Sequence, residues 1–226
     1  MSLTDTEKAA AARKSLEYVK DGMIVGLGSG STATFAIRFL GEQVRQGLNI
    51  RGIPTSRASG ELARSLNIPL TSFDETDHTD VTIDGADEVA PGLALIKGGG
   101  GALLHEKIVA SSSRKLVIVA DEHKMVEHLG HFPLPVEVIP FAAGPIRKQL
   151  ENMGAHPMLR AAHDGSPYIT DEGNYIYDCH YENILDPPAL AQTLKSMTGV
   201  VEHGLFLGLA SVAIIAGPNG SRIVNP

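Results

Sequence analysis

The sequence predicts an α/β fold, in which a Rossmann-like open sheet is accompanied by a second, smaller ferredoxin-like α+β domain. Strand-like and helix-like segments alternate through the first half of the chain, as in parallel sheets with helical crossovers. The continuous apolar run 116–120 suits a strand that is covered on both faces. The pattern of strand-like and helix-like segments changes near 132–135, and a βαββαβ order follows. We therefore expect one domain at 1–130 with 205–226, and the small domain at 131–204.

The elements of the first half follow from local signals. Thr4-Asp5-Thr6-Glu7 has the form of a capping box with Thr4 at the cap, and the helix it opens is expected to end near Gly22. Strand and helix patterns then alternate, with one pair of adjacent strands. We expect strands at 23–27, 52–54, 81–84, 93–97 and 116–120, and helices at 32–44, 60–66 and 102–111.

The elements of the second half are shorter and begin with a strand at 136–139. A helix at 145–153, a hairpin-like pair around 171–174, a helix at 188–197 and a strand at 200–202 complete the small domain. The final apolar segment, 210–216, is followed by a turn at 217–220 and is expected to return to the first sheet.

Composition excludes several classes of function. With 19 basic and 26 acidic residues the net charge is −7, which argues against sequence-independent nucleic-acid binding. Cys179 is the only cysteine, so no internal disulfide is possible and a reducing compartment is expected. The N-terminus lacks the pattern of a signal peptide, and no apolar run is long enough to span a bilayer. We expect a cytoplasmic protein with no membrane partner.

The first segment that suggests chemistry is Gly28-Ser29-Gly30-Ser31-Thr32, between a strand and a helix. Its glycines and hydroxyls, with the N–H groups that open the helix, suit a phosphate. The same residues also fit a G-x-G-x-x-A dinucleotide motif ending at Ala33. That motif requires an acidic residue after the second strand, where Pro54-Thr55-Ser56-Arg57 stands instead. Arg57 keeps an NADP interpretation open, and a P-loop is excluded because no lysine follows.

The second segment is Asp84-Gly85-Ala86-Asp87-Glu88, which crowds three carboxylates at the end of a strand. An ordinary capped turn would use the same residue types, and a divalent metal is a further alternative. By itself this segment does not decide between them.

The third segment is Lys97 followed by Gly98-Gly99-Gly100-Gly101 and by a helix that contains Glu106. Four glycines lose much conformational entropy on folding, so close approach of a ligand is a reasonable compensation. Glu106 has Leu103 and Leu104 before it and Ile108 and Val109 after it, and we expect burial to raise its pKa, as suits a general base. A solvated glutamate paired with Lys107 is the alternative. Because ligands bind at the carboxyl ends of parallel strands, we expect the three segments to converge.

Together with Phe132-Pro133-Leu134-Pro135-Val136-Glu137-Val138, these three segments have an order and spacing that resemble the type A ribose-5-phosphate isomerase family. The resemblance extends along nearly the whole chain. It departs at Gly101, where some relatives have alanine. It implies interconversion of ribose 5-phosphate and ribulose 5-phosphate in the non-oxidative pentose phosphate pathway, with no metal or other cofactor and with a homodimer or homotetramer as the assembly.

The resemblance also implies roles for individual residues. Glu106 matches the base that moves the proton, Asp84 and Asp87 match carboxylates that handle the sugar hydroxyls and ring opening, and Lys97 lies beside the reacting carbons. Lys124 matches a second substrate-binding lysine, and Lys8 is a possible phosphate contact. The full set of expected substrate contacts is Ser29, Gly30, Ser31, Thr32, Asp84, Gly85, Ala86, Asp87, Lys97, Gly98, Gly99, Gly100 and Lys124.

Other interpretations remain. A sugar-phosphate deaminase, a coenzyme A transferase or a non-catalytic sugar-phosphate sensor could share the scaffold, and a nicotinamide-dependent dehydrogenase is disfavoured by the missing acidic residue. The cluster of His123, Glu127, His128 and His131 lacks a metal-binding pattern. Cys179 is interpreted as a buried structural residue rather than a nucleophile.

Overall fold

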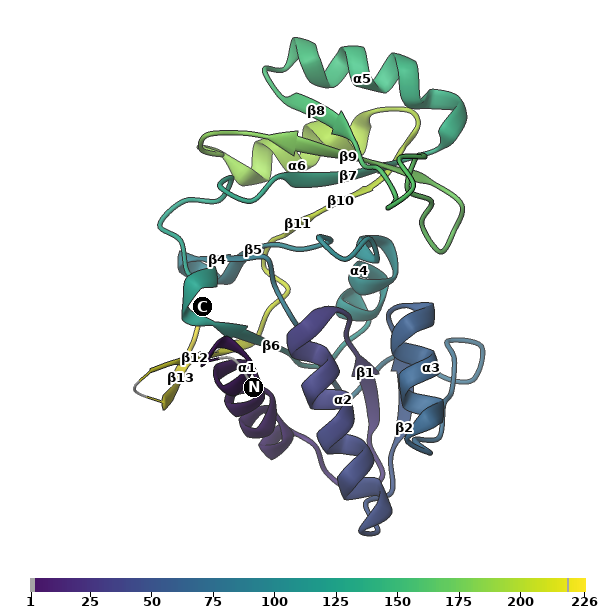
Figure 1. Cartoon of the computed structure of the whole chain (residues 1–226), viewed down its shortest axis with the longest axis vertical. Helices are drawn as coiled ribbons and strands as arrows, with labels where there is room; N and C mark the ends of the chain where they lie inside the picture. Colours follow the sequence, from purple (N-terminus) through teal and green to yellow (C-terminus); the bar gives the residue numbers. More distant parts are fainter. Residues whose placement is uncertain (1–2, 219) are drawn as a thin grey trace. The chain divides into compact units, whose positions relative to one another are not determined.

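The computed structural model describes residues 3–218 and 220–226, which form two units (Figure 1). The first unit contains the chain up to Ala86, His105–Met125 and Gly208–Pro226, and the second contains Asp87–Leu104 and Val126–Leu207. The second unit thus includes residues 87–104, which the domain limits expected from the sequence assign to the first domain. Those limits concern domains that fold independently, and they stay a prediction.

The first unit is built on a six-stranded sheet with the order β13-β12-β6-β3-β1-β2. Neighbouring strands from β12 to β2 are parallel, and β13 is an antiparallel edge strand. Burial along the inner strands is continuous, as expected for strands covered on both faces. The strands are β1 (Ile24–Leu27), β2 (Arg51–Pro54), β3 (Val81–Asp84), β6 (Leu116–Asp121), β12 (Val212–Gly217) and β13 (Gly220–Val224).

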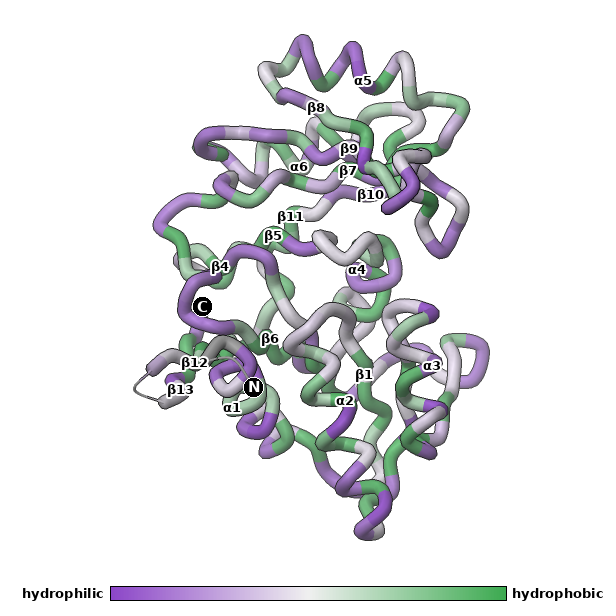
Figure 2. The backbone as a smooth tube through the Cα atoms, in the orientation of Figure 1, coloured by the Kyte–Doolittle hydropathy of each residue, from purple (hydrophilic) through white to green (hydrophobic). Residues whose placement is uncertain are grey.

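The helices of this unit cover the two faces of the sheet. Alternate residues of a strand point to opposite faces, so Val25 packs in the core that includes Ala36 of α2, whereas Ile24 packs with Val109 of α4. The green colour along β6 and β12 in Figure 2 follows this continuous burial. The helices are α1 (Leu3–Ser15), α2 (Gly30–Arg45), α3 (Arg57–Ser65) and α4 (Leu103–Ser111).

The second unit contains a four-stranded antiparallel sheet with the order β10-β7-β9-β8. Its chain order, β7-α5-β8-β9-α6-β10, confirms the predicted βαββαβ plan. Ile146 and Leu150 of α5 and Leu194 of α6 belong to one core, and Figure 2 shows α5 alternating between hydrophilic and hydrophobic residues. The elements are β7 (Leu134–Val138), α5 (Ala143–Asn152), β8 (His156–Leu159), β9 (Tyr175–His180), α6 (Pro187–Ser196) and β10 (Val200–His203).

A third, small sheet corrects the prediction for 93–97. That strand does not continue the parallel sheet: β5 (Ala94–Ile96) pairs antiparallel with β4 (Glu88–Ala90) and with β11 (Leu205–Phe206). Strand β4 is only three residues long and begins at Glu88, the last residue of the segment that an ordinary capped turn would also explain, so the sequence gives no separate sign of it. The segment around Lys97 therefore leaves a sheet of a different kind from the one that carries Asp84.

Several predicted ends are also corrected. Helix α1 begins at Leu3, so Thr4 lies inside its first turn and is not the cap. The turn predicted at 171–174 leads into β9, whose hairpin partner is β8, and residue 219 of the turn predicted at 217–220 lies outside the described residues. Short 3-10 helices occupy Leu16–Tyr18, Pro91–Leu93, Glu122–Lys124 and Pro140–Ala142. None of the helices in the described part of the chain combines the length and hydropathy needed to cross a bilayer.

Candidate active site

The first turn connects β1 to α2. Gly28 continues the strand pairing by donating its N–H to the carbonyl oxygen of Ile83, at 3.0 Å. The N–H of Ser29, the residue before α2, donates to Oδ1 of Asp84 at 3.0 Å. The predicted phosphate turn and the first predicted carboxylate therefore lie in direct contact.

The Ser29 hydroxyl is engaged away from the helix. Its Oγ lies 2.8 Å from Thr55 Oγ1 and 2.8 Å from Ser56 Oγ, and it makes no capping hydrogen bond to α2. The first-turn N–H groups of α2 therefore receive no cap from this side chain, and a helix N-terminus attracts negative charge. Of the two other predicted hydroxyl donors, Ser31 is exposed and Thr32 is buried. The turn has the features of an anion site.

The end of β2 separates the phosphate and dinucleotide interpretations. Thr55 and Ser56 occupy the place where a dinucleotide motif needs an acidic residue, and both are bonded to Ser29. Ser56 also caps α3 through Ser59, and Arg57 is the first residue of that helix. The local structure uses these residues to hold the turn, which favours the phosphate interpretation.

Asp84, the last residue of β3, is 1% exposed. Its Oδ1 accepts the N–H of Ser29 and, at 2.8 Å, the N–H of Gly85. Two backbone donors on one oxygen fix the orientation of the carboxylate. It is held in place by the turn that it contacts.

The other two carboxylates of this segment each have hydrogen-bond partners of their own. Asp87 Oδ2 accepts the N–H of Gly99 at 2.7 Å. Glu88 lies in β4 and is 3% exposed, and its two oxygens accept the N–H groups of Gly130, at 2.8 Å, and Phe132, at 2.5 Å. Glu88 is a structural anchor for the chain that enters β7, because it satisfies two backbone donors there.

Lys97 directly follows β5 and begins the second turn. Its N–H donates to the carbonyl oxygen of Gly204 at 2.9 Å, and its Nζ lies 5.4 Å from the centre of the Phe206 ring. The residue is 1% exposed, and an ammonium group near an aromatic face is electrostatically favourable. Lysine is seldom this deeply buried without a specific environment.

The four glycines after Lys97 form a closed turn within the second unit. Gly98 and Gly101 have positive φ angles of 96° and 82°, and the N–H of Gly101 donates to the Gly98 carbonyl at 2.9 Å. Such angles favour glycine over all other residues. The same carbonyl also accepts Nη1 of Arg160 at 3.0 Å.

Sequence analysis missed Arg160. It is separated from Gly98 by 62 positions in the chain, and no local pattern marks it. It follows β8, and its partner Asp178 lies on β9, so the pairing of these two strands brings both to the turn. Only a signal that links distant positions would have found them.

Glu106 lies in the first turn of α4 and is 5% exposed. Leu103 and Val109 on the same helix are fully buried, whereas Ile108 is 45% exposed. The alternative of a solvated helix glutamate is therefore wrong, since solvent barely reaches this side chain. A carboxylate in the first turn of a helix is also favoured by the helix dipole. Its raised pKa stays a prediction.

The two remaining predicted residues are lysines of the first unit. Lys124 ends the short 3-10 helix that follows β6, and Lys8 lies in α1; both are partly buried. Their predicted substrate contacts are not tested by these positions.

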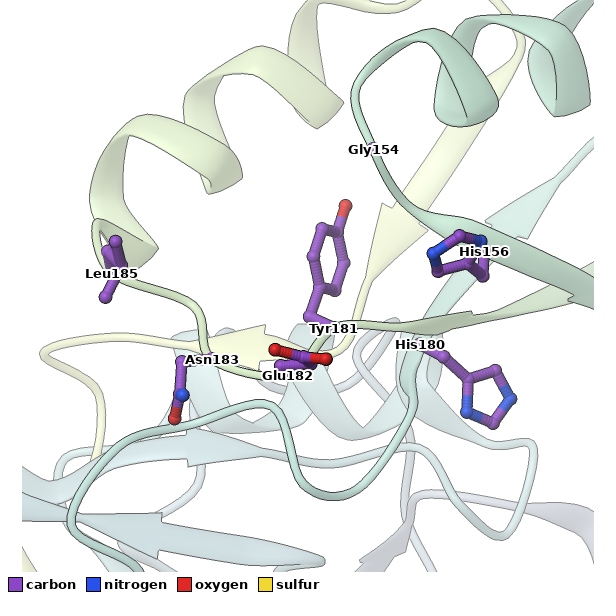
Figure 3. Close-up of a pocket in the computed structure, with 7 residues that line it drawn as sticks. All are labelled: Gly154, His156, His180, Tyr181, Glu182, Asn183 and Leu185. Atoms are coloured by element: carbon purple, nitrogen blue, oxygen red, sulfur yellow. The ribbon is translucent and has the colours of Figure 1, made fainter.

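Cys179 and a surface hollow lie elsewhere in the second unit. Cys179 is fully buried on β9, and burial raises the pKa of its thiol to about 12, which supports a structural role. A hollow of about 450 Å³ is lined by residues of β8 and β9, by the loop after β9 and by Gly154 before β8. Figure 3 shows these lining residues, none of which is a predicted site residue. Within the described residues, no three His, Cys, Asp or Glu side chains are grouped as metal ligands. The hollow is lined by Gly154, His156, His180, Tyr181, Glu182, Asn183 and Leu185.

The fold and these contacts define an α/β protein with a glycine- and hydroxyl-rich turn after its first strand and a lysine–glycine turn in its second unit. A family model described as ribose 5-phosphate isomerase A (phosphoriboisomerase A) matches residues 51–220. The chain belongs to this family.

Individual relatives agree with this assignment over nearly their full length. A protein of Afipia carboxidovorans named ribose-5-phosphate isomerase A is 52% identical, and the match covers 100% of this chain and 98% of the relative. The protein of the same name from Brucella suis is 50% identical, with 96% of each chain covered.

Solved structures give the same result. A D-ribose-5-phosphate isomerase in complex with phospho-erythronic acid superposes with a TM-score of 0.96 at 38% identity, with both chains fully covered. Ribose 5-phosphate isomerase A from Methanocaldococcus jannaschii has a TM-score of 0.95 at 39% identity, covering 99% of this chain and 100% of that one.

Proposed function

We propose that the chain interconverts D-ribose 5-phosphate and D-ribulose 5-phosphate through an enediolate. The structural observation that carries the proposal is Glu106, a buried carboxylate one helical turn after the lysine–glycine turn. Family membership and the names of the full-length relatives support the same activity. Phospho-erythronic acid, which is bound in a similar structure, is also a phosphorylated sugar derivative.

The phosphate end of the substrate is assigned to the first turn, Ser29 to Thr32, and Lys8 is a further candidate contact. The N–H groups that open α2 supply donors without adding a positive side chain. The sugar end is assigned to the remaining predicted residues. These are Asp84, Gly85, Ala86, Asp87, Lys97, Gly98, Gly99, Gly100 and Lys124.

The reaction moves one proton between adjacent carbons. Asp84 assists opening of the furanose, which exposes the C1 aldehyde of ribose 5-phosphate. Glu106 takes the proton from C2, leaving an enediolate whose negative charge is on the oxygens, and returns it to C1 while the hydroxyl proton of O2 passes to O1, which gives the ketose. Lys97 and N–H groups of the glycine turn stabilise the oxyanion, a contribution of several kcal/mol in comparable sites, about 3 kcal/mol per donor. All of these steps use groups of the protein itself.

The first test replaces Glu106 by glutamine, which keeps the shape and removes the base. We expect Glu106→Gln to lower kcat by about 10²- to 10⁴-fold and to abolish exchange of the C2 proton of ribose 5-phosphate with deuterated water. The measurement is ribulose 5-phosphate formation from ribose 5-phosphate alone, with exchange followed by NMR.

Glu127→Gln is the matched control, because the Glu127 side chain is 89% exposed and has been assigned no role in the reaction. It should leave both readouts unchanged. Isomerisation by a folded Glu106→Gln variant within a few-fold of the unaltered protein would remove Glu106 from this role. Failure of the unaltered protein to isomerise ribose 5-phosphate would refute the activity itself.

The same assay addresses the rival functions. A dehydrogenase would require a nicotinamide, a deaminase an amino sugar, and a sensor would bind the sugar phosphate without converting it. The hydrogen bonds that join Thr55 and Ser56 to Ser29 disfavour the dehydrogenase. We further propose that the chain acts in the cytoplasm, in the non-oxidative pentose phosphate pathway, as a homodimer or homotetramer.

A further inference from the structure

Arg160 forms a clamp on the glycine turn of the second unit. Its Nε donates to Asp178 Oδ2 at 2.9 Å and its Nη2 to Asp178 Oδ1, which is the bidentate pairing that a guanidinium favours. Its Nη1 donates to two backbone carbonyls, those of Gly98 at 3.0 Å and Gly99 at 3.2 Å. The Arg160 side chain is 13% exposed and that of Asp178 is 22% exposed. One partly buried cation thus joins a strand to two successive peptides of the turn.

The backbone of Arg160 is held as firmly as its side chain. Its N–H donates to the carbonyl oxygen of Ile176 in β9 at 2.8 Å, and its own carbonyl oxygen accepts the N–H of Tyr168 at 2.9 Å. Its guanidinium carbon lies 5.9 Å from the centre of the Tyr168 ring. The clamp is therefore built from the sheet and does not depend on a mobile surface side chain.

The clamp determines which way the turn peptides face. In a trans peptide the C=O and N–H point in opposite directions, so fixing the carbonyl also aims the N–H. In the peptide that joins Gly98 to Gly99, the Gly98 carbonyl accepts a hydrogen bond from Arg160, and the Gly99 N–H donates one to Asp87. The next peptide has its carbonyl on Arg160, and its N–H, that of Gly100, has no protein partner among the residues described. Gly100 is exposed, and a Cβ built on it would meet no atom within 4 Å.

A carbonyl that accepts a bond from a cation makes the N–H of the same peptide a stronger donor. Arg160 therefore both directs and polarises the Gly100 N–H, an open donor three residues after Lys97. We propose that Arg160 is a positioning residue for isomerisation: it aims the Gly100 N–H at the enediolate oxygen. This inference rests on the proposed function and extends it to a residue that does not itself touch the substrate.

The test is a variant series at Arg160. Loss of an oxyanion donor lowers kcat by about 10²- to 10³-fold, and because Arg160 acts indirectly we expect Arg160→Ala to lower kcat by about 10- to 100-fold. The KM for ribose 5-phosphate should change little, since the oxyanion exists only after the proton is removed. Guanidinium chloride, added well below unfolding concentrations, should restore part of the lost kcat by refilling the guanidinium position.

Three variants separate positioning from general stability. Arg147→Ala removes an exposed ion pair with Glu151 on α5 of the same unit, and it should leave kcat unchanged. Arg160→Lys cannot pair with Asp178 and reach both carbonyls, so it should restore kcat only in small part. Asp178→Asn keeps the carbonyl contacts and should lower kcat less than Arg160→Ala.

Binding of phospho-erythronic acid gives a readout that does not depend on turnover. Its carboxylate places negative charge at the sugar end, so Arg160→Ala should weaken this ligand by calorimetry more than it raises the KM for ribose 5-phosphate. An unchanged kcat, or a kcat loss that guanidinium does not relieve and that is matched by an equal rise in KM, overturns the role of Arg160 alone. Absence of activity in the unaltered protein overturns the proposed function and this role with it.

Discussion

The two glycine turns are built alike but are surrounded differently. Each donates one N–H to a carboxylate, Ser29 to Asp84 in the first unit and Gly99 to Asp87 in the second. A Cβ added at Gly28 would lie 2.5 Å from the carbonyl oxygen of Ile83 and 2.6 Å from the Cα of Asp84. A Cβ added at Gly101 would instead meet the Tyr168 ring, 2.3 Å from its hydroxyl oxygen. At Gly28 the first turn is thus confined by backbone atoms of β3, together with Asp84 Oδ1 at 2.4 Å, whereas at Gly101 the three nearest atoms all belong to the Tyr168 side chain.

This contrast shows which atoms set the backbone geometry of each turn. Backbone atoms of β3 cannot move without disturbing a central strand, so the first turn is set by the sheet itself. Side chains can rotate, so the second turn depends on particular residues such as Arg160 and Tyr168. Turn geometry in the first unit follows from the fold, and in the second unit it is tuned by residues far away in the sequence.

The largest effect is expected from Gly28→Ala. Because its Cβ would collide with backbone, we expect a loss of about 3 kcal/mol or more in the free energy of unfolding, measured by urea denaturation. Gly30→Ala is the matched control: Gly30 has a positive φ of 87° but no atom within 4 Å of a built Cβ. It should lose only about 1 kcal/mol, from backbone strain. Equal losses in the two variants would contradict the contrast between the turns.

A smaller loss of stability is expected from Gly101→Ala, and a second substitution should partly reverse it. Strain at its φ of 82° and the contact with Tyr168 should together lower the free energy of unfolding by about 2 kcal/mol. Tyr168→Ala in the same chain should recover part of this loss, because the double variant removes the contact. Gly100→Ala meets no atom within 4 Å and should be nearly neutral.

Additive losses for Gly101→Ala and Tyr168→Ala would show that the second turn is as rigidly bounded as the first. This test also concerns the one departure from the family resemblance. Glycine at 101 has a local reason, because an alanine there would require Tyr168 to move.

The smallest effect concerns the sheet behind the second turn, where Asp178 and Cys179 point to opposite sides of β9. Burial raises the pKa of Cys179 from 9.0 to about 12, so the thiol ionises more readily in the unfolded chain. Its contribution to stability is complete below pH 9 and is lost as the pH rises towards the folded value. The difference in unfolding free energy between the unaltered protein and Cys179→Ala should therefore narrow by about 1 kcal/mol between pH 8 and pH 10. A difference that is constant over this range would place the thiol in contact with solvent.

Most of the fold could be predicted because its signals are local. The apolar run that became β6, the periodicity of α2 and the βαββαβ order all depend on residues within a few positions of one another. The prediction for 93–97 had the strand but not its sheet. One partner, β11, is more than 100 residues away, since Leu205 pairs with Ile96, and the nearer partner, β4, is only three residues long. Strand pairing is a long-range property, and propensity carries no information about it.

The candidate site divides in the same way. Ser29, Asp84, Asp87, Lys97 and Glu106 could be named as candidates because the order and spacing of their three segments resemble those of the family; their roles stay predictions. Glu88 was placed in the same cluster, although the structure uses it to bind two backbone N–H groups. Arg160 was not predicted, because an arginine after a short strand has the appearance of an ordinary surface residue.

The kind of protein could be inferred from the amino acids alone: alternating strands and helices, a small second domain, and three polar segments whose residue types suit a sugar phosphate. Which carboxylate accepts hydrogen bonds from which turn, and that Arg160 reaches the carbonyls of Gly98 and Gly99, became known from the folded chain. The physical reason is the range of the interactions. Backbone preference and hydrophobic periodicity act over a few residues and are determined by neighbours in the chain. A hydrogen bond between distant segments exists only after the sheets have brought them together.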